Sequence, residues 1–109
     1  MPAPERRKAE RACEAEATAS ARRALVLRLK RIEGQLRGIQ SMIEADADCE
    51  AIAQQMSAAR KALDKTYFEL AACAIAHPRF AAAPPAPRGA GERPDERLLR
   101  ITRTLAKYA

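Results

Sequence analysis

Aromatic residues, histidine and glycine are scarce in this chain. Its 109 residues include no Trp, two Phe, two Tyr, one His and four Gly. A hydrophobic core must therefore come mostly from Ala, Leu, Ile and Met, a composition that favours helices. A single histidine excludes any mechanism that needs two histidines from one chain, and the length allows one domain but excludes most large enzyme folds.

Long apolar runs are also missing. No stretch approaches the roughly 18 residues needed to cross a bilayer, and residues 1–23 are charged throughout. Three cysteines, Cys13, Cys49 and Cys73, are an odd number at wide spacing, which fits neither a disulfide framework nor a zinc knuckle. We therefore expect a cytoplasmic protein with free thiols and no membrane partner. We do not expect an enzyme, because no general base, oxyanion arrangement or phosphate loop accompanies the thiols.

Apolar residues recur with helical spacing in two segments. The first set predicts an amphipathic helix that extends back to about Pro4, and its members alternate four and three residues apart: Leu25, Leu29, Ile32, Leu36, Ile39 and Ile43. Asp48 is suited to cap a second helix that begins at Cys49. The second set continues until Pro78 stops the helix: Ile52, Met56, Ala59, Leu63, Thr66, Leu70, Cys73 and His77.

The composition divides the chain into four segments. These are an N-terminal, partly helical extension (1–21), a two-helix core (22–77), a Pro/Gly-rich linker (78–93) and a short C-terminal helix (94–109), which Pro94, Asp95 and Glu96 open. The predicted fold class is all-α, a helical hairpin plus a short helix. Such a chain cannot bury two long apolar stripes by itself. We expect an antiparallel four-helix bundle of two chains, and a dimer of dimers.

Basic residues exceed acidic ones, 20 against 14, for a net charge of +6. This excess predicts a polyanionic partner. Several basic residues lie one helical turn apart, so a bundle can present a basic strip to phosphates: Arg28, Lys30, Arg31, Arg37, Lys61 and Lys65. Ordinary solvated helix positions explain the same charges. Because no helix-turn-helix, zinc-finger or base-stacking pattern is present, the charge alone only suggests nucleic acid.

Four motifs follow one another within the two-helix core. They are RLKRIEGQLRGIQ (28–40), MIE (42–44), DC (48–49) and QQMSAAR (54–60). Together they closely resemble the CsoR/RcnR/FrmR family of small, all-helical bacterial repressors. The similarity covers about residues 22–77.

The resemblance implies a homodimer or homotetramer that binds operator double-stranded DNA and releases it when an inducer binds. Inducers in this family are Cu(I), Ni(II), Co(II), formaldehyde or a persulfide. Arg28, Lys30 and Arg31 match family positions tied to DNA binding, and Lys65 matches a basic position on the second helix. Cys49 matches the inducer-site cysteine of the family. No cofactor is expected to be required for the fold.

The rest of the sensor site departs from the family's copper sensors. Those proteins carry a His and a Cys where this chain has Ala74 and Pro78, and this chain offers Cys73 and His77 one position earlier, in reversed order. Two thiolates and one imidazole suit Cu(I) or Zn(II), and Ni(II) remains a family inducer. Two thiols equally suit a sensor of persulfide, or of formaldehyde, that works by thiol chemistry.

Helix geometry restricts how the sensor residues meet. Cys49 and Cys73 are 24 residues apart on one predicted helix, which separates them by roughly 36 Å. An antiparallel bundle instead places Cys49 of one chain near Cys73 and His77 of its partner, so we expect an inducer site between subunits. Two other classes stay open: a thiol- or metal-handling protein that does not bind DNA, and a coiled-coil adaptor. Cys13 is expected to be incidental.

Overall fold

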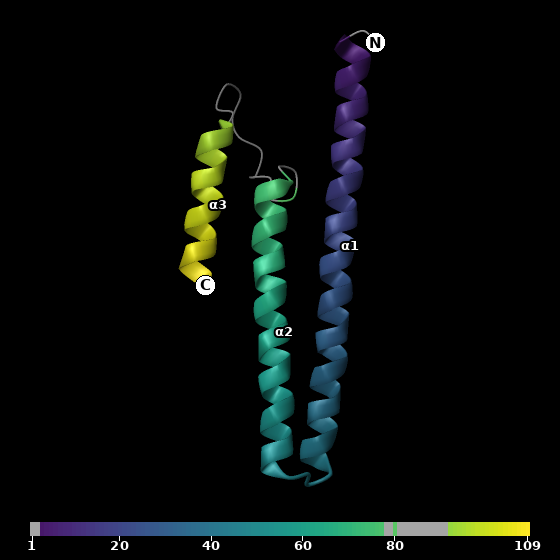
Figure 1. Ribbon diagram of the computed structural model, residues 1–109, viewed down its shortest axis with the longest axis vertical. Helices are drawn as coiled ribbons and strands as arrows, with labels where there is room; N and C mark the ends of the chain where they lie inside the picture. The colour runs from purple at the N-terminus through teal and green to yellow at the C-terminus, as the bar shows by residue number, and fades with distance from the viewer. Residues whose placement is uncertain (1–2, 78–79, 81–91) are drawn as a thin grey trace. The chain divides into compact units, whose positions relative to one another are not determined.

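The described residues form three helices, which run along the chain in the order α1, α2, α3 (Figure 1). A computed structural model describes residues 3–77, 80 and 92–109 and contains α1 (Ala3–Glu44), α2 (Cys49–Ala76) and α3 (Pro94–Tyr108), with no strand in these ranges. The all-α fold class is therefore confirmed. The chain forms two compact units, Ala21–Leu70 and Met1–Ser20 with Ala71–Ala109. Most of the predicted linker, 78–93, lies outside the described residues.

Helix α1 runs for 42 residues without interruption. Its first part lacks an apolar stripe but is rich in Ala, Glu and Arg, which are strong helix formers. Thr18 is buried in this part, and its Oγ1 donates a hydrogen bond to the Glu14 carbonyl at 2.9 Å. Helix α1 includes Ala3, the first described residue, so it reaches back as far as the start that the sequence predicts near Pro4.

A short turn joins α1 to α2. After Glu44, Asp46 adopts a φ of 56°, a left-handed conformation that Asp tolerates better than most residues. The Asp48 side chain then accepts a hydrogen bond from the Ala51 backbone N–H, with Oδ2 3.3 Å from the nitrogen. Asp48 therefore caps α2 as predicted, and Cys49 is the first residue of this helix.

In the unit of residues 21–70, α1 and α2 lie side by side and antiparallel (Figure 1). One row of side chains from each helix is buried between them, with members seven residues apart: Leu25, Ile32 and Ile39 of α1, and Ala59 and Thr66 of α2. This interval marks one half of a coiled-coil seam. Thr66 meets its hydrogen-bonding requirement within α2 by donating from Oγ1 to the Ala62 carbonyl at 2.9 Å.

The other half of each predicted stripe is exposed. Leu36 of α1 is 48% exposed, and Met56 and Leu63 of α2 are 54% and 51% exposed. These side chains belong to an apolar groove of about 250 Å³ along the hairpin, lined by Ile32, Leu36, Ile39, Met56, Ala59, Arg60 and Leu63. As predicted, one hairpin does not bury both of its stripes.

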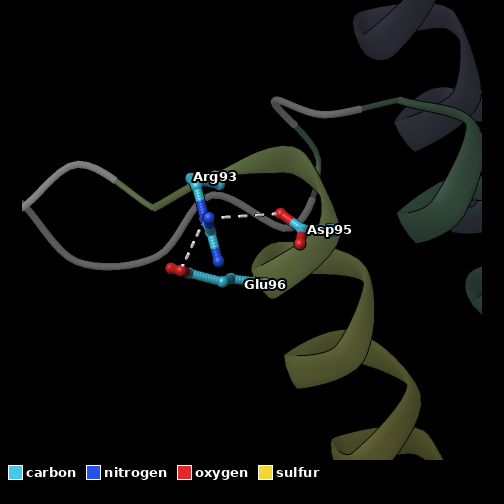
Figure 2. Close-up of polar contacts among 3 residues, drawn as sticks. All are labelled: Arg93, Asp95 and Glu96. Carbon is cyan, nitrogen blue, oxygen red and sulfur yellow. Dashed lines mark hydrogen bonds and ion pairs between the residues drawn. The ribbon is translucent and has the colours of Figure 1, made fainter.

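Helix α3 begins after Arg93, whose backbone is extended, with Pro94 as the first helical residue. The Arg93 side chain contacts the first turn of α3, where its Nε lies 2.8 Å from Glu96 Oε1 and 3.6 Å from Asp95 Oδ1 (Figure 2). Both carboxylates complement the helix dipole at this end. The predicted opening of α3 by Pro94, Asp95 and Glu96 is confirmed.

Candidate functional site

Three of the six predicted DNA-binding side chains, Arg28, Arg31 and Lys65, line one hollow between α1 and α2. The hollow has a volume of about 330 Å³ and lies wholly within residues 21–70. We call it the basic hollow, and its remaining lining consists of Ile32, Gln35, Ala62 and Thr66. Guanidinium, ammonium and carboxamide groups all donate hydrogen bonds to oxygen anions, so this set suits a phosphate.

Arg28 also forms an ion pair across the hairpin. Its Nη2 lies 3.8 Å from Glu69 Oε1, and the two side chains are 46% and 50% exposed. That distance is too long for a hydrogen bond, and an exposed pair of this kind contributes about 1 kcal/mol or less. Glu69 and Gln35 could not be predicted from the sequence, because their neighbours belong to the other helix of the hairpin.

The other three predicted DNA-binding residues, Lys30, Arg37 and Lys61, are exposed and do not line the basic hollow. Arg37 pairs with Glu33, one turn earlier on α1, at 3.1 Å between Nη2 and Oε1. A single hairpin therefore gathers half of the predicted basic set.

The predicted sensor residues stand at the two ends of α2. Cys49 is exposed at its first residue, and Cys73 is half-buried three residues before its last, Ala76. His77 is also half-buried and follows the helix directly. Its backbone N–H donates to the Cys73 carbonyl at 2.9 Å, so Cys73 and His77 are one turn apart, a spacing that makes side chains neighbours. One chain thus brings Cys73 and His77 together but not Cys49.

The donor set tests whether a metal fits. All three cysteines are free, and within the described part of the chain no three His, Cys, Asp or Glu side chains gather as a metal site. Two thiols and one imidazole are ligands that soft metals prefer. The donor atoms present are therefore of the type that a soft metal ion prefers, provided that two chains contribute them: Cys49, Cys73 and His77.

The positions used by the family's copper sensors differ here. The resemblance predicts that Ala74 stands where those proteins carry a His, and Ala74 is buried, at 6% exposure. Pro78, which the resemblance predicts at the position of their Cys, lies outside the described residues. The chain therefore has no coordinating side chain at either position.

The all-helical fold and the four motifs are typical of one class of protein. The model of the metal-sensitive transcriptional repressor family matches residues 21–102, so the chain belongs to that family, whose members are repressors and not enzymes. The predicted family is confirmed, and the match extends past residue 77 into α3.

One similar protein is the copper-sensing transcriptional repressor CsoR of Bacillus subtilis (strain 168). It is 38% identical to this chain over 80 residues, which cover 73% of this chain and 76% of the relative. No solved structure matches the chain significantly. Among the described residues, no helix is both long and apolar enough to span a membrane.

Proposed function

We propose that the chain represses transcription as an oligomer on operator DNA. It releases the DNA when a soft metal ion binds, and Cu(I) is the first candidate for that ion. The proposed metal site combines Cys49 of one chain with Cys73 and His77 of another. The observation that carries this proposal is the placement of these donors at opposite ends of α2. Membership of the metal-sensitive repressors and similarity to a copper-sensing relative support the choice of inducer.

The apolar groove supports the assembly. Leu36, Met56 and Leu63 are about half exposed there, and covering them removes apolar surface from water. An antiparallel second hairpin would complete a four-helix bundle, in which a two-fold axis places the start of one α2 beside the end of the other. The contact that buries the groove would thus also assemble the inducer site, in a homodimer that can pair again into a homotetramer.

The basic hollow supports DNA binding. Arg28, Arg31 and Lys65 present three cationic side chains there, and contacts to phosphate hold a protein on duplex DNA without reading bases. Every additional chain in an oligomer would carry its own basic hollow. Lys30, Arg37 and Lys61, exposed outside the hollow, would add to the long-range attraction.

The placement of the two sites suggests how an inducer acts. A bound soft metal supplies bonds that hold thiolates and imidazole from two chains together. Cys49 and His77 stand at the ends of α2, whereas Lys65 of the basic hollow belongs to its middle. A shift of α2 relative to the partner chain would change the spacing of the basic hollows, which is the coupling that a repressor requires.

Persulfide or formaldehyde is the second candidate inducer for the same scaffold. The resemblance predicts that buried Ala74 stands at a ligand position of the copper sensors, and half-buried Cys73 offers a second thiol instead. A persulfide would transfer its outer sulfur to the Cys49 thiolate and release a thiol, and attack by Cys73 of another chain would then form an inter-chain disulfide and release sulfide. Formaldehyde would join the two thiols through a methylene bridge and release water. A metal would bind both sulfur atoms without a covalent link between them. A thiol- or metal-handling protein without DNA binding is the further alternative.

Replacing single cysteines tests the proposal. Reduced wild-type protein should bind duplex DNA from its own promoter region in fluorescence anisotropy and release it when Cu(I) is added. Cys49→Ala should bind equally well but fail to release, because the intersubunit site lacks a ligand. Cys13→Ala is the matched control, since Cys13 is also an exposed, free thiol, and it should respond like the wild type.

Parallel titrations separate the alternatives. Zn(II), Ni(II), persulfide and formaldehyde are added in the same assay, and the released protein is weighed by intact-mass spectrometry. A covalent Cys49–Cys73 link between chains would contradict the metal proposal and support the persulfide or formaldehyde alternative. Normal release from Cys49→Ala would exclude Cys49 as the sensor, and absence of DNA binding by the reduced wild type would favour the metal- or thiol-handling alternative.

A further inference from the structure

Glu69 is an acidic side chain paired with the basic hollow. Its carboxylate lies 3.8 Å from the Arg28 guanidinium, measured from Oε1 to Nη2. On α2 it follows Lys65 by four residues, a spacing that makes side chains neighbours on a helix surface. One negative charge therefore stands close to two of the three cations that line the hollow.

We propose that Glu69 competes with DNA phosphate for the basic hollow and so lowers the affinity for DNA. This inference rests on the proposed DNA binding through Arg28, Arg31 and Lys65. Carboxylate and phosphate both present oxygens that a guanidinium binds. Arg28 must exchange Glu69 for a phosphate when DNA binds, and the displaced carboxylate then repels that phosphate.

The exposure of the pair allows this exchange. Half of each side chain is in solvent, so water replaces the lost contact at little cost. The ion pair of Arg37 with Glu33 differs, because both partners belong to one turn of α1 and Arg37 lies outside the hollow lining. Glu69 thus differs from Glu33 because its partner, Arg28, belongs to the other helix and lines the basic hollow.

The test compares two variants that remove the same charge from the same helix. Glu69→Gln removes the competitor, and Asp64→Asn removes an exposed carboxylate of α2 that does not line the hollow. Binding is measured by fluorescence anisotropy on a labelled duplex of mixed sequence, because phosphate contacts do not depend on the bases. Glu69→Gln should bind about two- to fivefold more tightly at low salt, and the gain should shrink as salt is raised.

Asp64→Asn should change the affinity much less. In an Arg28→Ala background the gain from Glu69→Gln should be clearly smaller, because the ion pair with Arg28 is then absent and only repulsion of the phosphate remains. An equal gain from both substitutions, or an undiminished gain without Arg28, would overturn the proposal. Circular dichroism checks that every variant keeps the helical content of the wild type.

A second measurement separates this inference from the proposed function. Inorganic tripolyphosphate, at matched ionic strength, should raise the melting temperature of Glu69→Gln more than that of the wild type or of Asp64→Asn. If reduced wild-type protein does not bind DNA, the repressor proposal fails while this comparison still measures competition at the hollow. Equal shifts in all three proteins would reject the competition itself.

Discussion

At the scale of single residues, the turn between α1 and α2 determines where the candidate sensor cysteine lies. Asp46 takes the left-handed conformation that redirects the chain, and Asp48 caps α2 so that Cys49 becomes its first residue. Both roles suit a short acidic side chain, which tolerates a positive φ and accepts hydrogen bonds from free N–H groups. The position of Cys49 therefore depends on its two neighbours in the turn.

Replacing Asp48 tests the cap. Asp48→Ala should lower the free energy of unfolding by about 1 kcal/mol, because the Ala51 N–H loses its acceptor. The value is measured by urea denaturation. Asp48→Asn removes the same charge but keeps an oxygen able to cap, so its stability should stay close to that of the wild type. Equal destabilisation by Asn and Ala would mean that the charge, and not the cap, matters.

Local residues such as Asp48 and Cys49 were predictable because capping and motif spacing involve residues close together in the chain. Glu69 and Gln35 were not, although both belong to helices that the sequence predicted correctly. Glu69 gains its role from Arg28 on the other helix, and Gln35 from a hollow that both helices line. No periodic pattern encodes such pairs.

At the scale of the helices, each predicted apolar stripe contains two rows with different environments. On α1, Leu25, Ile32 and Ile39 are buried within the hairpin, whereas the intervening Leu29 and Leu36 are 46% and 48% exposed. Alternation of four and three residues produces both rows, since they are the two halves of a heptad seam. The exposed row is the surface that a second chain would cover.

A charge in the exposed row tests this assignment. Leu36→Glu should weaken self-association by roughly a hundredfold or more, because two leucines per dimer lose their burial. Sedimentation velocity over a concentration series measures the change. Leu27→Glu is the matched control, since Leu27 is 58% exposed on α1 but does not line the apolar groove. If both variants associate like the wild type, the groove is not the contact.

At the scale of the whole molecule, burial is shallow. The described part of the chain contains no large side chain that is fully buried, and its buried hydrophobic residues number six: Leu25, Ile32, Ile39, Ala59, Ala74 and Ile101. Small domains bury a low fraction of their surface and are marginally stable alone. Most of the stability should therefore come from contacts between chains.

This dependence predicts that the melting temperature rises with protein concentration, because unfolding is then linked to dissociation. Differential scanning calorimetry at several concentrations measures the effect in the absence of metal. Leu36→Glu should melt at a lower temperature with little dependence on concentration. A melting temperature of the wild type that is the same at every concentration would instead indicate a chain that is stable as a monomer.

The sequence by itself determined the helices, the cap of α2 and the family, because periodicity, capping and motif spacing are local properties. From the same motifs it predicted Cys49 as the sensor cysteine. Only the tertiary structure decided which apolar row is buried in the hairpin, that Arg28, Arg31 and Lys65 share one hollow, and that Glu69 pairs with Arg28. These features depend on the register between α1 and α2. That register follows from the packing of whole side-chain rows and not from any single segment.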